Sequence, residues 1–321
     1  MASHALRADP SDAQRALLTK VAWYALLVHS IAHILSSIAF ATFLIPPAPP
    51  WLATPTNQKI LAFGLTWGGQ GTVVIGAIAG FAFCATWIGM RRTVIVASVA
   101  FLVTLGAELF GVWSGFPFGV YSYSGRLGYK VLDLVPYNIP TSWFYMLVAC
   151  LAMCARLLPA KDDLSSRLWW AFNCGLLLTA WDVVMDPAMV KTAHWIWNVP
   201  DLSAESAFVR FIGEPIFFGM PITNWLGWLF TGTVVGFSVL LIVPPSAWAA
   251  TLTRSRFPLY LYAVNGVLAF AICFAQDMVP AGLLGLVTMG LPLWLAWRAD
   301  ARAADALAGA RLPGGIATAG D

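Results

Sequence analysis

Eight long apolar stretches divide this chain, and they constrain its fold more than any other feature. Each holds about 20 mainly apolar residues, the length that an α-helix needs to cross the hydrocarbon core of a bilayer. Of the 321 residues, 60% are hydrophobic and 10% are charged, whereas about one quarter of an ordinary soluble domain is charged. The sequence therefore predicts an all-α, polytopic transmembrane helix bundle. Its spans are expected near residues 21–45, 60–89, 93–115, 141–159, 167–186, 222–243, 257–278 and 281–298.

The basic residues are divided unevenly between the two sides of such a bundle. With eight spans, one side carries both termini and every second connection, and it holds thirteen of the 18 Lys and Arg residues. Since cytoplasmic loops are enriched in Lys and Arg, we expect both termini in the cytoplasm of a bacterial cell and the spans in its inner membrane. The chain then divides into a cytoplasmic segment (1–20), a transmembrane catalytic domain (21–299) and a disordered cytoplasmic tail (300–321). The basic residues form no patch, so no nucleic-acid partner is expected.

Two acidic residues close the fifth apolar stretch. Asp182 and Asp186 are four residues apart, so on a helix they share one face. Ionisable groups within a membrane span are costly and usually functional. Two neighbouring carboxyl groups in an apolar environment do not easily ionise together, so one of them can keep its proton and act as an acid. The alternative is solvation at a helix end, above all for Asp186, because Pro187 favours a helix boundary there.

Further polar residues fall at a similar depth. Glu108 lies in the third stretch, His29 and His33 in the first, and Asn224 at the start of the sixth, all towards the outer side. We therefore expect one polar pocket in the outer half of the bundle. The three carboxyl groups are its candidate catalytic residues, and the two histidines and the amide are its supporting polar residues.

Each of these residues also has an ordinary structural explanation. Glu108 can pair with Arg126 or Lys130 of the following loop, and the amide and the histidines can simply join two helices. His29 and His33 project from the same helix face, so they cannot be the two axial ligands of one haem. The chain has only 4 histidines, too few for a membrane di-iron site, and we expect no metal.

Two long connections are expected on the outer side. Residues 116–140 alternate aromatic and small residues around Ser124-Gly125, which predicts a short hairpin over the bundle. Residues 188–221 contain the run FIGEPIFFGMP, which predicts a broken or re-entrant segment. An interfacial aromatic belt explains most aromatic residues here. The candidates to line a pocket for an apolar ligand and to stabilise a cation are Trp181, Trp143, Tyr121 and Trp195.

The remaining polar features predict no further site. Asp277, Glu214 and Asp133 are expected to be solvated at helix ends or in loops. The 5 cysteines lie in apolar runs without a CxxC spacing, so neither a disulfide nor a thiolate metal site is expected. Motifs for phosphate binding, serine hydrolysis and zinc proteolysis are absent from the sequence.

Three sequence blocks stand out together. They are AELFGVWSGFPFGVYSYSGRLGYKVLDLVPYNIPTSWFYM (107–146), WDVVMDPAMVKTAHWIW (181–197) and FFGMPITNWLGWLFTG (217–232). In combination they resemble the integral membrane carotenoid hydratases. That family includes the γ-carotene and lycopene 1′,2′-hydratases and the haloarchaeal bisanhydrobacterioruberin hydratases. The likeness extends over roughly residues 20–300.

The resemblance implies a cofactor-free hydro-lyase that adds water across the C1′=C2′ double bond of an acyclic ψ end group. The substrate would be lycopene, γ-carotene or a similar carotenoid, and a downstream carotenoid glycosyltransferase or desaturase would act on the product. Protonation at C-2 gives a tertiary carbocation at C-1, which water captures, so the site needs an acid, a base and aromatic faces. We expect Asp182 to donate the proton, Asp186 to keep it protonated and Glu108 to deprotonate the water. The acid and base roles can also be reversed.

Three other functions stay open at this level. A membrane carotene cyclase would protonate the same end group but trap the cation with an internal alkene. A proton-coupled transporter of an apolar solute would place acids at the membrane midplane and show inverted repeats, whereas these acids lie towards one face. A non-catalytic carotenoid-binding protein would not need an acid pair.

Overall fold

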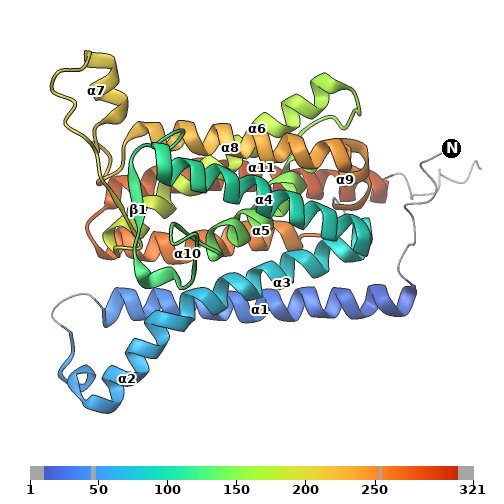
Figure 1. Cartoon of the computed structure of the whole chain (residues 1–321). Coiled ribbons are helices and arrows are strands. Elements are labelled where there is room, and N and C mark those ends of the chain that lie inside the picture. Colours follow the sequence, from blue (N-terminus) through green and yellow to red (C-terminus); the bar gives the residue numbers. More distant parts are fainter. Residues whose placement is uncertain (1–10, 45–47, 253–254, 310–321) are drawn as a thin grey trace, which may run out of the picture.

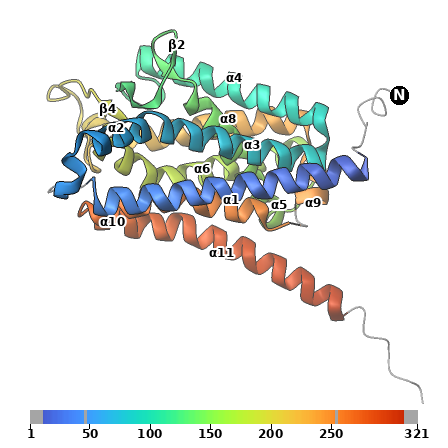
Figure 2. The same cartoon turned by 90° about the horizontal axis from the view of Figure 1, so that it is seen from below.

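The computed structural model describes residues 11–44, 48–252 and 255–309. Within these residues, 8 helical segments are long and apolar enough to cross a membrane, which confirms the predicted all-α bundle, and they pack side by side (Figures 1 and 2). These segments are α1 (Asp12–Thr42), the continuous series of α2 (Pro55–Phe63), η3 (Gly64–Gly68) and α3 (Gly69–Ile88), α4 (Met90–Ser114), α5 (Asn138–Leu157), α6 (Leu164–Lys191), α8 (Ile222–Ile242), α10 (Phe257–Ala275) and α11 (Val279–Gly309). A short helix, α9 (Pro245–Leu252), precedes α10, and η2 (Pro50–Ala53) precedes α2.

The ends of the first and last helices differ from the expected boundaries. α1 begins at Asp12 because Ser11 and Gln14 form a capping box, in which each side chain accepts a hydrogen bond from the other residue's backbone N–H. α11 continues to Gly309, so the first part of the expected disordered tail is helical. Residues 1–10, residue 45 at the expected end of the first span and residues 310–321 lie outside the described part of the chain. The side of the membrane on which each terminus lies stays a prediction.

The fifth span does not end before Pro187, so that expected helix boundary is wrong. α6 continues through Pro187 to Lys191. Proline removes one hydrogen bond from a helix interior, but the following turn is closed, because Thr192 N–H donates to the Ala188 carbonyl at 3.1 Å. Asp186 is therefore an interior position of a buried helix and not a solvated helix end.

α5 forms the centre of the bundle. Its side chains are buried along almost its whole length, and it packs against α3, α4, α6 and α10 (Figure 1). α6 and α8 approach closely because glycine lies between them, as is usual for helices packed in membranes. A Cβ on Gly175 would lie 2.8 Å from the Leu229 carbonyl oxygen. These contacts hold α4, α5, α6 and α8 together, and Glu108, Asp182, Asp186 and Asn224 lie on three of these helices.

The two long connections meet in a small sheet at one end of the bundle, which we call the loop end. β1 (Tyr121–Tyr123) pairs antiparallel with β4 (Trp195–Trp197), with Ser122 opposite Ile196. Tyr121 and Tyr123 are buried and Ser122 is exposed, the alternation expected of a half-buried strand. Each connection is thus held in place by the other, and their inward aromatic residues cover the bundle.

The sequence predicted a hairpin around Ser124-Gly125, and this position is wrong. The chain enters a short 3-10 helix there, η4 (Gly125–Leu127), and the hairpin follows it as β2 (Lys130–Val131) and β3 (Val135–Pro136). The aromatic alternation predicted a strand correctly, but the partner of that strand comes from the other connection.

The connection after β4 is broken, as predicted. Its short helix α7 (Ala207–Gly213) has no buried residue and projects from the bundle (Figure 1). A tight turn follows, in which Phe217 bridges to Met220 and Gly219 has a φ of 89°, a conformation that glycine adopts easily. α8 begins directly after this turn.

Candidate active site

Asp182 and Asp186 form a buried carboxyl dyad on α6. Their side chains are 0% and 1% exposed. Asn224, from the first turn of α8, donates its amide N–H groups to Oδ2 of Asp182 at 2.8 Å and to Oδ2 of Asp186 at 2.5 Å. Trp195 of β4 donates its indole N–H to Oδ1 of Asp186. Oδ1 of Asp182 is buried and has no hydrogen-bond partner in the described structure.

The electrostatic surroundings of this dyad are acidic. The ionisable groups that act on Asp182 are Asp186 and Glu108. Two carboxylates placed side by side in a low dielectric repel strongly, so a dyad of this kind titrates as a unit that shares its protons. The sequence expectation of an acid pair on one helix face thus corresponds to one bridged structural unit.

Glu108 is held separately, on α4, by three hydrogen-bond donors. Its Oε2 accepts hydrogen bonds from the hydroxyl of Tyr121 at 2.5 Å and of Tyr123 at 2.7 Å. Its Oε1 accepts one from the indole N–H of Trp143 at 3.1 Å. These donors take the place of the ion pair with Arg126 or Lys130 that we considered from the sequence. A carboxyl group surrounded by donors is placed to act as a carboxylate, which only accepts hydrogen bonds.

The two tyrosines remain protonated and therefore remain donors. Burial and the neighbouring Glu108 carboxylate raise the pKa of Tyr121 well above its usual value. The same two causes raise the pKa of Tyr123. Both side chains come from β1, whose pairing with β4 sets their position. The small sheet therefore fixes donors on Glu108 and, through Trp195, on Asp186.

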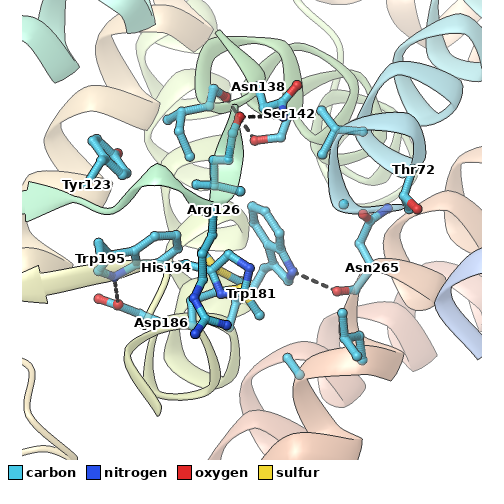
Figure 3. A pocket seen from close by; sticks show the side chains of 18 of the residues that line it. Thr72, Tyr123, Arg126, Asn138, Ser142, Trp181, Asp186, His194, Trp195 and Asn265 are labelled. Carbon is cyan, nitrogen blue, oxygen red and sulfur yellow. Dashed lines mark hydrogen bonds between the residues drawn. The ribbon is translucent and has the colours of Figure 1, made fainter. Parts of the chain in front are cut away.

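Glu108, Asp186 and the two tyrosines all line one cavity of about 220 Å³ (Figure 3). Asp186 and Trp195 lie on one side of it and Thr72 and Asn265 on the other. Of the residues predicted from the sequence, those that line it are Glu108, Asp186, His33, Asn224, Trp181, Trp143, Tyr121 and Trp195. Asp182 and His29 are not among the lining residues. Asp186, which is nearer the loop end than Asp182, therefore faces the cavity.

Three tryptophans form a rigid aromatic wall. The rings of Trp143 and Trp228 stack with centroids 4.1 Å apart, and Trp181 meets Trp228 edge to face at 5.7 Å. Hydrogen bonds fix two of the indoles, since Trp143 donates to Glu108 and Trp181 donates to the Asn265 carbonyl at 3.0 Å. Such a wall offers π faces to a cation without an opposing charge.

The two predicted histidines lie together but apart from the carboxyl groups. The rings of His29 and His33 meet edge to face at 4.5 Å, and Nδ1 of His29 lies 2.9 Å from the Thr72 carbonyl oxygen. In the described structure neither histidine forms a hydrogen bond with a carboxyl group. Of the two, only His33 reaches the cavity.

The sequence analysis missed several residues of the cavity. Tyr123 had a signal, because it alternates with Tyr121 in the sequence YSY and must share its strand face. Asn265 is an amide within the seventh span, as unusual there as Asn224, and it accepts a hydrogen bond from the Tyr145 hydroxyl at 3.3 Å. Trp228 had no signal beyond an aromatic belt that explains it equally well.

A second, more polar cavity of about 330 Å³ adjoins the first at the loop end. The two share Phe40, Leu65 and Arg126, and the second adds Lys191 and Gln276. It places two cationic side chains beside the acidic site and at the surface of the bundle.

The described residues contain no group of three His, Cys, Asp or Glu side chains that could hold a metal ion. The five cysteines are free and buried.

Comparison with known proteins identifies the family. Residues 68–292 match the family model described as carotenoid biosynthesis protein, a region that contains all three carboxyl groups. The chain is 27% identical over 210 residues to the bisanhydrobacterioruberin hydratase of Haloarcula japonica. This alignment covers 64% of the chain and 64% of that relative, so the chain spans just under two thirds of the relative's length. No solved structure matches the chain significantly. Because the family model covers well over half of its length, the chain belongs to the carotenoid biosynthesis protein family.

Proposed function

We propose that this protein adds water, without a cofactor, across the C1′=C2′ double bond of an acyclic ψ end group in a carotenoid such as lycopene or γ-carotene. The observation that carries the proposal is one cavity lined by Asp186 of the bridged aspartate pair, by the separately held Glu108 and by the three tryptophans. The name of the curated relative, a hydratase, supports the same class of reaction. The product is a tertiary 1′-hydroxy carotenoid.

The reaction has two bond-forming steps. The acid transfers a proton to C-2, and the π electrons of the double bond form the new C–H bond, which leaves a positive charge on the tertiary C-1. The oxygen of a water molecule then bonds to C-1, and the base takes the proton that this water loses. The substrate gains one water, the acid loses one proton and the base gains one. Transfer of that proton back to the acid through water restores the enzyme.

We assign the acid to the Asp182–Asp186 dyad, with Asp186 facing the substrate. This differs in detail from the sequence expectation, which placed the donated proton on Asp182. Asp186 lines the cavity, whereas Asp182 lies behind it with one oxygen free of hydrogen bonds. A proton kept on that pair avoids two adjacent charges in a low dielectric. Asn224 bridges both carboxyl groups and so keeps Asp182 in place to share the proton with Asp186.

We assign the base to Glu108. Hydrogen bonds from three donors favour the carboxylate form of Glu108, and its position on α4 separates it from the dyad on α6. An acid and a base that act on opposite sides of one bond must leave room for a water molecule between them. Glu108 and Asp186 both line the cavity, and Trp143 connects Glu108 to the tryptophan wall because it donates to Glu108 and stacks on Trp228. The tryptophan faces would stabilise the carbocation between the two steps.

The second cavity offers a route for the water. It is lined by Arg126, Lys191 and Gln276 and adjoins the site at the loop end, so water and protons need not cross the apolar part of the bundle.

The test is the mass of the carotenoids made by lycopene-producing cells that express the protein. The wild type should convert lycopene into a pigment heavier by one water, or by two if both ends react. Glu108→Gln and Asp186→Asn should each lower this conversion by roughly 10²–10⁴-fold, the usual contribution of a general acid or base. Glu214→Gln is the matched control, since Glu214 is an exposed acid outside the cavity, and it should behave as the wild type.

Two results would contradict the proposal. Wild-type conversion by both Glu108→Gln and Asp186→Asn would remove the acid and the base from the mechanism. A product of unchanged mass that needs both carboxyl groups would show a cyclase that traps the same cation internally.

A further inference from the structure

We propose that the carotenoid enters the site sideways from the bilayer, through an opening between α1 and the glycine-rich segment Gly64–Gly69, and that its polyene chain rests there while the end group reacts. This inference deepens the proposed function and rests on it for the identity of the ligand. It names a binding site for the long apolar part of the substrate.

The active-site cavity itself extends to this opening. Besides the carboxyl groups, it is lined by Ser36 and Phe40 of α1 and by Gly64, Gly68 and Gly69 of η3 and α3. These three glycines are exposed at the surface of the bundle. The cavity therefore continues from the acids to a side of the protein that lies within an apolar span, Pro55–Ile88.

The helix beside the opening leaves the bundle. Neither α2 nor η3 contains a buried residue, and Figure 1 shows α2 angled away from α1. The chain makes one π-helical turn at Gly64–Gly68, a distortion often found at functional sites. Exposed apolar side chains flank this turn, and Ile60, Phe63 and Trp67 are 64%, 68% and 56% exposed. Such a surface suits the apolar polyene chain of a carotenoid.

Packing does not explain the glycines of this segment. A Cβ added at Gly64, Gly68 or Gly69 would meet nothing within 4 Å. Deeper in the same span the reverse holds, because a Cβ on Gly76 would lie 2.8 Å from His29 and one on Gly80 would lie 2.9 Å from Tyr145. What sets Gly64, Gly68 and Gly69 apart from Gly71 and Gly106, which also meet nothing, is that they line the cavity. At Gly64, Gly68 and Gly69 the missing side chain widens the cavity mouth.

The experiment fills the opening and measures binding and hydration separately. Gly68→Leu is the test variant, and Gly68→Ala is its graded partner. Gly71→Leu and Gly106→Leu are matched controls, because a Cβ at either position also meets nothing within 4 Å and neither residue lines the cavity. Lycopene bound per protein is read from the pigment absorbance after purification, in the Glu108→Gln background so that no turnover occurs. Hydration is read from the pigment mass in the otherwise wild-type background.

We expect Gly68→Leu to lower both bound lycopene and its hydration by roughly tenfold or more, the effect of inserting a side chain into an occupied space. Gly68→Ala should have a smaller effect, and the two controls should stay within about twofold of the wild type. The free surroundings predict that Gly68→Leu folds, which its unfolding in detergent verifies. Binding of lycopene by Gly68→Leu at the wild-type level would overturn the lateral opening and leave the hydratase proposal intact. Loss of binding in Gly68→Leu, together with a wild type that hydrates nothing, would support the opening and refute the hydratase.

Discussion

The hydroxyl of Tyr123 provides a sensitive test of the charge on Glu108. Tyr123→Phe keeps the buried ring and removes only the donor, which lies 2.7 Å from Oε2 of Glu108. A hydrogen bond to a charged group contributes roughly 1.5–3 kcal/mol to stability, and one between neutral groups roughly 0.5–1.5 kcal/mol. If Glu108 is a carboxylate, the substitution should therefore lower the free energy of unfolding by about 1.5–3 kcal/mol. Hydration should fall as well, because the base is less firmly held.

The assay is a double-mutant cycle on unfolding in mixed detergent micelles. Tyr123→Phe is compared in the wild-type and Glu108→Gln backgrounds, where the glutamine amide can face the phenols and its carbonyl oxygen can face Trp143. In the glutamine background the cost of losing the hydroxyl should shrink to about 0.5–1.5 kcal/mol, which leaves a coupling energy of about 1 kcal/mol or more. Ser122→Ala, on the exposed face of the same strand, controls for damage to the sheet. Equal costs in both backgrounds would refute the assignment of Glu108 as an ionised base.

Three further predictions concern the Asp182–Asp186 dyad, the loop residue His194 and the packing of α6 against α8. Asn224→Leu removes the donor that bridges both aspartates, so hydration measured by pigment mass should fall at least about tenfold, as when a hydrogen bond to a charged group is lost. Burial and the nearby Arg126 lower the pKa of His194 to about 4 from an ordinary value near 6.5. The unfolded chain therefore binds a proton there that the folded chain does not, and stability rises with pH across this window. Lowering the pH from about 7 to about 5 should thus destabilise the wild type more than His194→Gln, a difference that thermal unfolding detects. Gly175→Ala should lower the free energy of unfolding by about 1–3 kcal/mol, whereas Gly106→Ala, which meets nothing within 4 Å, should not.

The sequence predicted the architecture well because few backbone structures can span a membrane. Backbone groups in lipid must bond within their own segment, so apolar length alone indicated the eight helices. The depth of each polar residue in the membrane then followed from its position along its span. This is why Glu108, Asp186 and Asn224 could be assigned to one region from the sequence and do line one cavity.

The rotation of each helix about its own axis, and the pairing of strands far apart in the sequence, were harder to predict. Whether Asp182 or Asp186 faces the cavity depends on how α6 is turned against α8, and the small residues that set this contact carry no directional signal of their own. The partner of β1 could not be inferred, because β4 lies in the other connection and both strands are short. The helix boundary at Pro187 failed for a related reason, since tertiary packing holds α6 together on both sides of a residue that would break an isolated helix.

The most direct measurement of the central claim is the origin of the atoms that the product gains. Purified protein in lipid nanodiscs would be given lycopene in water enriched with heavy oxygen, and in a second reaction in deuterium oxide. The account predicts that the new hydroxyl carries the heavy oxygen of water and that one deuterium is bound to the adjacent carbon, with neither label incorporated by Glu108→Gln. A hydroxyl oxygen that does not come from water, or a product without carbon-bound deuterium, would contradict acid-catalysed hydration.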